Sequence, residues 1–83
     1  MKEVPDYFLS HRHAAAECPV VFAAWQGFVS PLRGHLVLSS CTVGDHQLWW
    51  RVTASDADAA LAMLPGYVLA RTQAVEVGEV AVP

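Results

Sequence analysis

Two histidines one residue apart stand beside further polar and thiol side chains. His11 and His13 flank Arg12, and Glu17 and Cys18 follow closely. In an extended strand, side chains two residues apart point to the same face, about 7 Å apart along it. Imidazole nitrogens suit Zn, Cu and Ni, and a cysteine adds a softer sulfur ligand. His11, His13 and Cys18 therefore form a candidate transition-metal site.

This ligand set is incomplete for a structural zinc site, which needs about four protein ligands. His35, His46 or Cys41 would have to join it through the fold or through a second subunit. Simpler interpretations remain open, with histidines half-solvated at a strand end or in turns and two free thiols. A histidine in a cavity can also act as acid or base on a ligand, because its ordinary pKa of about 6.5 lies near neutrality.

A second candidate site lies in the tryptophan-rich segment. Trp49 and Arg51 are two residues apart in an expected strand, so their side chains point to the same face of it. Trp49 would supply an apolar wall and Arg51 would pair with an anionic group, as in many small-molecule pockets. Alternatively, Arg51 forms a structural ion pair with Glu76 or Glu79. The expected ligand-binding residues are His11, His13, Trp49 and Arg51.

Several common functional signatures are missing from the sequence. The five glycines are scattered, so there is no glycine-rich phosphate loop. No Ser-His-Asp or Cys-His arrangement has a recognisable local signature. Asp56 and Asp58 are explained by a helix start. The net charge of −3 argues against a nucleic-acid binder, which needs a basic surface. Catalytic residues are therefore not identifiable.

The elements that must position these residues follow the order strand, helix, strand, strand, helix, strand. Pro19 fits the first turn of the first helix and Gly27 its end. Gly44 and Asp45 signal a hairpin, and Ser55 can cap the second helix. The expected strands cover residues 7–13, 36–43, 47–54 and 72–82, and the expected helices cover residues 17–26 and 55–64. This order predicts a ferredoxin-like α+β fold, with a four-stranded antiparallel sheet and two helices on one face.

Composition adds an expectation about assembly. The chain has 83 residues, which suits a single domain over residues 1–83, and 54% of them are apolar while only 16% are charged. A domain of this size buries only about 63% of its surface. Both faces of the sheet are apolar, and the helices cover one of them. In the first helix, Phe22 and Trp25, with Phe28 or Val29, form the expected buried stripe. A homodimer whose sheets stack about 10 Å apart would bury the other face and enclose a cavity.

The sequence predicts a cytoplasmic protein that is not bound to a membrane. Residues 1–6 contain no apolar signal core. The most apolar stretch, residues 14–29, is shorter than the roughly 20 residues of a membrane span. Two cysteines do not make a disulfide framework.

Three segments carry a resemblance to the dimeric α/β-barrel superfamily: the Trp49-Trp50 strand, residues 55–60 and residues 75–80. The sequence also resembles a group of short, uncharacterised actinobacterial proteins. The superfamily resemblance implies a homodimer and, if the protein is an enzyme, a cofactor-independent monooxygenase or isomerase. The superfamily also includes haem-handling and small nickel-binding proteins. The helix histidine of the nickel-binding relatives has no counterpart after Asp58.

The leading hypothesis is a homodimer that binds a small molecule between its sheets without a cofactor. One alternative is a protein that binds Ni, Zn or Cu through His11, His13 and Cys18. Another is a purely structural or regulatory dimer.

Overall fold

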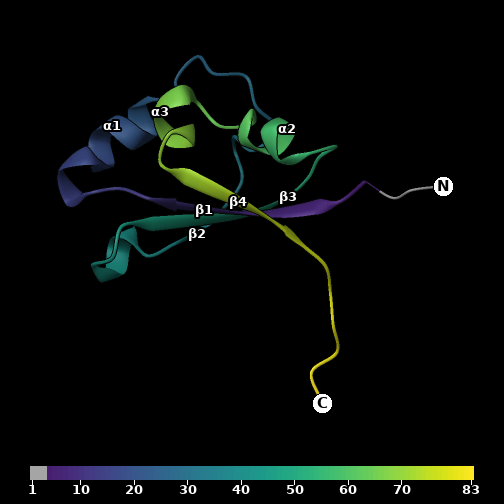
Figure 1. Ribbon diagram of the computed structural model, residues 1–83. Helices are drawn as coiled ribbons and strands as arrows, with labels where there is room; N and C mark the ends of the chain where they lie inside the picture. The colour runs from purple at the N-terminus through teal and green to yellow at the C-terminus, as the bar shows by residue number, and fades with distance from the viewer. Residues whose placement is uncertain (1–3) are drawn as a thin grey trace.

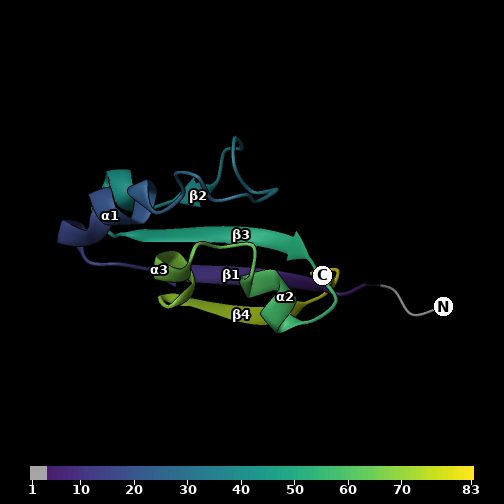
Figure 2. The same cartoon turned by 90° about the horizontal axis from the view of Figure 1, so that it is seen from above.

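The computed structural model describes residues 4–83; residues 1–3, part of the segment considered for a signal peptide, lie outside the described range. Four antiparallel strands form one sheet in the order β2-β3-β1-β4, and the α-helices lie on one side of it (Figures 1 and 2). The strands are β1 (Asp6–Arg12), β2 (Leu38–Ser39), β3 (Gln47–Thr53) and β4 (Thr72–Val77). The α-helices are α1 (Cys18–Ala23), α2 (Ala57–Leu61) and α3 (Gly66–Leu69), and two 3-10 turns are η1 (Ala15–Glu17) and η2 (Cys41–Val43). The expected α+β class and antiparallel sheet are confirmed.

The core lies between the sheet and the helices. Alternation along β1 and β3 sends every second side chain toward the helices, as the sequence predicted for β3. The strand register places Leu9 opposite Trp50 and His11 opposite Leu48. The buried apolar residues are Tyr7, Leu9, Val21, Leu48, Trp50, Val52, Ala54, Ala60, Leu64 and Val68. Among residues 4–83, no helix is long and apolar enough to cross a bilayer.

The expected second strand over residues 36–43 is wrong for most of its length. Only Leu38 and Ser39 pair with β3, and residues 41–43 form η2 instead. Ser40 explains the change, because its hydroxyl donates to the carbonyl of Asp45 and accepts from the Gln47 amide. These local bonds compete with strand pairing. Gly44 has φ 99°, the positive φ that the hairpin signal required.

The expected buried stripe of the first helix is also corrected. Helix α1 has six residues and follows the 3-10 turn η1, so a different side chain faces the sheet. Val21 is fully buried, whereas Phe22 is half exposed and Val29 almost fully exposed. Trp25 lies beyond the helix end and packs against Trp50, with ring centroids 6.0 Å apart. Gly27 has φ 74° at the predicted helix end.

The carboxyl-terminal half differs from expectation at three boundaries. Asp56, not Ser55, caps α2, and its Oδ1 accepts a hydrogen bond of 2.7 Å from the Ala59 amide. Helix α2 ends at Leu61 rather than at residue 64, and an additional short helix, α3, begins after Pro65, because proline cannot continue the hydrogen-bonded helix. Strand β4 ends at Val77 rather than at residue 82, and the exposed segment 78–83 leaves the sheet (Figure 1).

The face of the sheet opposite the helices has an ion-pair network at one end. Arg51 contacts Asp6 at 2.9 Å and Glu79 at 3.3 Å, and Thr53 donates to Asp6 at 2.8 Å. The structural ion pair expected for Arg51 with Glu79 is therefore present, and Asp6 joins it. The Thr53 hydroxyl and the Arg51 guanidinium hold the pKa of Asp6 below its usual range.

This lowered pKa predicts a pH dependence of stability. The pKa of Asp6 is below its unfolded value of about 3.9, so the ionised carboxylate stabilises the fold above that pH. The contribution disappears as the pH falls through the folded pKa. Urea unfolding should show the free energy of unfolding falling more steeply with decreasing pH in wild type than in Asp6→Asn once the pH is near or below the unfolded pKa of about 3.9. The stability difference between the two proteins should shrink as Asp6 becomes protonated in the folded state. Asp58→Asn, at an exposed position in α2, is the control. Parallel curves for wild type and Asp6→Asn would contradict the prediction.

Candidate metal centre

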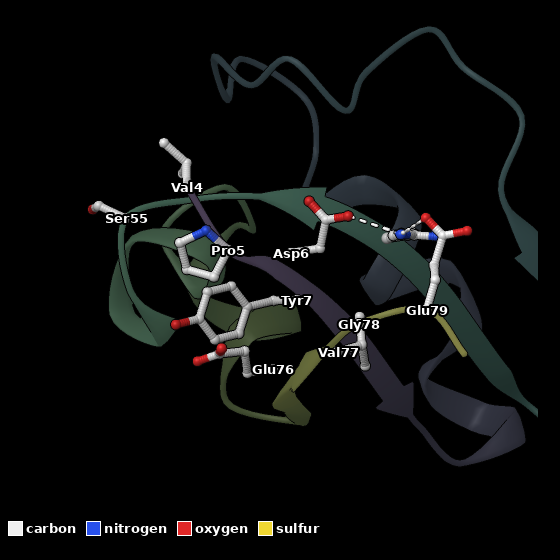
Figure 3. Close-up of a pocket in the computed structure, with 10 residues that line it drawn as sticks. Val4, Pro5, Asp6, Tyr7, Ser55, Glu76, Val77, Gly78 and Glu79 are labelled. Carbon is white, nitrogen blue, oxygen red and sulfur yellow. Dashed lines mark hydrogen bonds and ion pairs between the residues drawn. The ribbon is translucent and has the colours of Figure 1, made fainter. Parts of the chain in front are cut away.

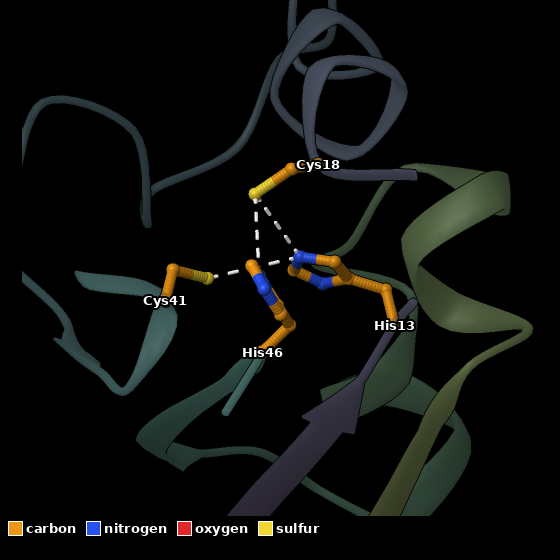
Figure 4. A group of neighbouring side chains, drawn as sticks. All are labelled: His13, Cys18, Cys41 and His46. Atoms are coloured by element: carbon orange, nitrogen blue, oxygen red, sulfur yellow. Dashed lines mark hydrogen bonds between the residues drawn. The ribbon is translucent and has the colours of Figure 1, made fainter. Parts of the chain in front are cut away.

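Four metal-ligating side chains converge at one end of the sheet. They are His13, Cys18, Cys41 and His46, and their donor atoms all lie within 4.8 Å of one another (Figure 4). His13 Nε2 lies 3.4 Å from Cys18 Sγ and 3.7 Å from Cys41 Sγ. Cys18 Sγ lies 3.7 Å from His46 Nδ1.

These separations match the edges of a metal-centred tetrahedron. Zinc bonds of about 2.3 Å to sulfur and about 2.0–2.1 Å to nitrogen place neighbouring donor atoms about 3.3–3.8 Å apart. All three distances above fall in that range. Three of the six donor separations thus already suit a common metal ion, and the other three lie within 4.8 Å.

The backbone brings the two histidines of this cluster together. The His13 amide donates to the His46 carbonyl at 3.0 Å, immediately beyond the last β1–β3 pair. Their imidazole centroids are 5.5 Å apart. The cysteines come from the adjoining turns, since Cys18 begins α1 and Cys41 begins η2. Four residues separate His13 from Cys18, and four separate Cys41 from His46.

A side-chain network fixes the start of α1 and with it Cys18. Glu17 accepts hydrogen bonds from the Tyr67 hydroxyl, from Arg71 Nε at 2.8 Å and from the Ala14 amide at 2.9 Å. Hydrogen bonds from Tyr67, Ala14 and Arg71 lower the pKa of Glu17 to about 2. The Arg71 guanidinium also stacks 3.7 Å above the Tyr67 ring. Helix α3 and the turn between α3 and β4 thus hold the segment that carries Cys18.

The cluster is partly shielded from water. His13 is buried, while Cys18, Cys41 and His46 are half-buried. Burial, and secondly the neighbouring His46, lower the pKa of His13, which favours its neutral, metal-binding form. Burial and then the neighbouring Cys41 raise the pKa of the Cys18 thiol. A bound cation would reverse this preference, because metals bind cysteine as the thiolate.

The sequence-predicted metal residues are only partly in this cluster. His13 and Cys18 belong to it, and Cys41 and His46 complete it through the fold. His11 lies behind His13, and His35 is exposed in the loop before β2. The mirrored spacing, four residues between histidine and cysteine in each pair, was the signal in the sequence that could have joined the two pairs.

The four residues of the expected ligand-binding site are not brought together. His11 faces the helices, where its cross-strand partner is Leu48. Trp49 and Arg51 alternate with the buried residues of β3 and lie on the open face. One pocket therefore cannot use all four residues.

No protein-family model matches the sequence. No similar curated protein and no similar solved structure was found. Function is therefore inferred from the chemistry of the described residues.

A hollow of about 740 Å³ lies at the other end of the sheet. Its walls include Tyr7, Glu76, Asp6, Glu79 and Arg51 (Figure 3). The Arg51 guanidinium is held by the two carboxylates Asp6 and Glu79. An anionic ligand would have to displace these carboxylates, so this hollow is a poorer candidate than the His/Cys cluster.

The turn that presents Cys41 and His46 depends on Gly44. An L-residue with a β-carbon costs about 1–2 kcal/mol in the left-handed region. Gly44→Ala should therefore lower the free energy of unfolding by about 1–2 kcal/mol, measured by urea denaturation. Gly78→Ala is the matched control, because Gly78 lacks a positive φ and an added β-carbon meets nothing within 4 Å at either position. Equal effects of the two substitutions would contradict this role of Gly44.

Proposed function

We propose that the protein binds one zinc ion at a site formed by His13, Cys18, Cys41 and His46. The observation that supports this most strongly is the set of donor separations, 3.4, 3.7 and 3.7 Å, which fit a tetrahedron. Four protein ligands leave no position for substrate, as in structural rather than catalytic zinc sites. The proposed role is structural.

The donor set favours zinc over the other metals considered. Two sulfur and two nitrogen donors in a tetrahedron are typical of zinc, whereas Cu(II) and Ni(II) favour planar or tetragonal arrangements. The cluster also connects segments with few other links, since Cys18 begins α1 and Cys41 belongs to the turn after β2. In a chain with a small core, such a link contributes directly to folding free energy.

Metal binding is tested by titration of the reduced, metal-free protein with zinc against a chromogenic chelator. We expect one zinc per chain, and a tetrahedral cobalt spectrum with sulfur-to-metal charge transfer after Co(II) substitution. Cys18→Ser and Cys41→Ser should each weaken zinc binding by more than about 100-fold, a larger loss than outer-shell changes cause. Zinc should raise the melting temperature of wild type, since it binds the folded state.

His35→Ala is the matched control, because His35 is exposed and lies outside the cluster. It should bind zinc as wild type does. Failure of wild type to bind zinc, or zinc binding by both cysteine variants that equals that of wild type, would refute the proposed function.

We also propose that the uncovered sheet face pairs with a second copy of the chain, in a ferredoxin-like dimer. The strand order β2-β3-β1-β4 supports the ferredoxin-like assignment and the resemblance to dimeric α/β barrels. The chain exposes 5759 Å², compared with roughly 4,900 Å² expected for a compact monomer of its mass. Phe8, Leu38 and Val75 are exposed on this face.

A second sheet is the occupant that this face fits best. Its apolar side chains project from flat strands, and two stacked sheets bury such rows at about 10 Å separation. The exposed segment 78–83 leaves β4 on the same side and carries Val80 and Val82 (Figure 1). A partner sheet would give these valines apolar surface to pack against. The excess exposed area is comparable with the roughly 800 Å² that each partner buries in a standard interface.

Such a dimer would also enclose a ligand groove. A groove of about 320 Å³ on this face is lined by residues that include Phe8, Leu38, Trp49 and Arg51. Trp49 would supply an apolar wall for a small molecule, and Arg51 would have to exchange Asp6 for the ligand. His11 and His13 take no part in this groove, because they lie on the helix-covered face.

Dimerisation is tested by sedimentation velocity at micromolar to high-micromolar concentration. Wild type should form a dimer, and Val75→Lys should weaken the dimer by at least tenfold, because the charge would be buried between sheets. Val29→Lys, at an exposed position away from the sheet, is the control and should leave the dimer unchanged. A monomeric wild type at high micromolar concentration would contradict this proposal without affecting the zinc site.

A further inference from the structure

His11 is a fully buried polar residue that the proposed metal site does not use as a ligand. It lies on the helix-covered face of β1, and its solvent exposure is 0%. Its Nε2 is 3.0 Å from His13 Nδ1. Its Nδ1 is 3.2 Å from the Val68 carbonyl and 3.0 Å from the Thr72 hydroxyl. Both ring nitrogens therefore have protein partners.

The partners at Nδ1 determine where the His11 proton lies. The Val68 carbonyl can only accept, and the Thr72 hydroxyl donates its one proton to that same carbonyl at 2.6 Å. The carbonyl cannot donate to His11, and the hydroxyl proton is used in the bond to that carbonyl, so these contacts place the imidazole proton on Nδ1. A neutral imidazole has one N–H, and burial disfavours the charged form. Nε2 of His11 is therefore an acceptor.

The tautomer of His11 also determines the tautomer of His13, because the two rings share a hydrogen bond. An acceptor at His11 Nε2 requires a donor at His13 Nδ1. The neutral His13 ring then has its lone pair on Nε2, the nitrogen that faces Cys18 and Cys41. The protein thus selects the tautomer that can bind a cation at the centre of the cluster.

We propose that His11 is a positioning residue, which accepts the Nδ1–H of His13 and so fixes His13 as an Nε2 ligand of the metal. This inference rests on the proposed zinc site. The nearby pair His11 and His13 is then one ligand and its hydrogen-bonded support, rather than two ligands. Support of this kind orients a metal-bound imidazole and raises its basicity.

The position of His11 explains how this support is anchored. Val68 lies in α3 and Thr72 begins β4, so both partners of Nδ1 belong to the segment that packs behind β1. Hydrogen bonds connect the Val68 carbonyl to His11 and His11 to His13. The carboxyl-terminal segment thus contributes to the metal centre without supplying a ligand.

The test compares zinc affinity in His11→Leu, His11→Gln and the control Leu48→Ala. Leu removes the acceptor, whereas the Gln amide oxygen can still accept from His13. Leu48 is the buried cross-strand neighbour of His11, so its truncation disturbs the core and leaves the hydrogen bond to His13 in place. His11→Leu should weaken zinc binding by about 10–100-fold, as loss of outer-shell partners does. His11→Gln should lose less, and Leu48→Ala should stay close to wild type.

Long-range ¹⁵N NMR shows which ring nitrogen of each histidine carries the proton. A purely structural role of His11 would leave the His13 tautomer unchanged. In zinc-loaded wild type, His13 should carry its proton on Nδ1 and the metal on Nε2. In metal-free wild type, His11 should be the Nδ1–H tautomer. Metal-free His11→Leu should show part of the His13 population with its proton on Nε2. If His11→Leu does not fold, His11→Phe, which also removes the acceptor, gives the same comparison of affinity and tautomer.

Three results would overturn the inference. One is equal zinc affinity in wild type and His11→Leu, and the second is coordination of His13 through Nδ1. The third is zinc binding in folded His11→Leu that is weakened as much as in the cysteine variants, together with an altered cobalt spectrum, which would make His11 itself a ligand. If wild type binds no zinc, the proposed function fails instead, and the metal-free spectrum still reports whether His11 accepts from His13.

Discussion

The pairing register of β1 with β3 is the constraint on which the rest of the structure depends. It places His11 opposite Leu48 and ends with Arg12 opposite Gln47. The hydrogen bond from the His13 amide to the His46 carbonyl extends this register by one step. A slip of one residue would turn every side chain of β1 to the other face. It would expose the histidines that now face the helices, so core and metal centre are specified by the same hydrogen-bond ladder.

The alternation of apolar residues predicted the strands that form the centre of the sheet. Trp50 faces the helices and Trp49 the open side, as period-two spacing required. Strand β2 could not be predicted in the same way, because Ser40 supplies hydrogen bonds that replace strand pairing over residues 41–43. The residue pattern of this segment is compatible with a strand, but the hydrogen bonds of the Ser40 side chain favour a turn instead.

The candidate site was predictable only in part for a related reason. His13 and Cys18 are close in sequence, so residue types and spacing were enough to group them. Cys41 and His46 join them through the β1–β3 register and the turn around Gly44. The turn has a local signal in the sequence, but the register that brings the two pairs together depends on strand pairing between distant residues. His11 was grouped as a ligand because strand periodicity places it on the face of His13. Its proposed role differs because its ring nitrogens contact Val68, Thr72 and His13 rather than the cysteines of the cluster.

Opposite faces of the sheet carry the two proposed properties. The metal centre lies on the helix-covered side at the carboxyl end of β1, and the apolar open face carries Trp49 and Arg51. Side chains alternate along β1 and β3, so those of the helix-covered face and those of the open face are different residues. A substitution on the open face should therefore change assembly while leaving the zinc ligands in place, and loss of a ligand should disturb α1 and η2 before it disturbs the central strands. Strands β1 and β3 supply side chains to both faces. A loss of pairing between these two strands would therefore remove the proposed metal centre and the proposed dimer face together.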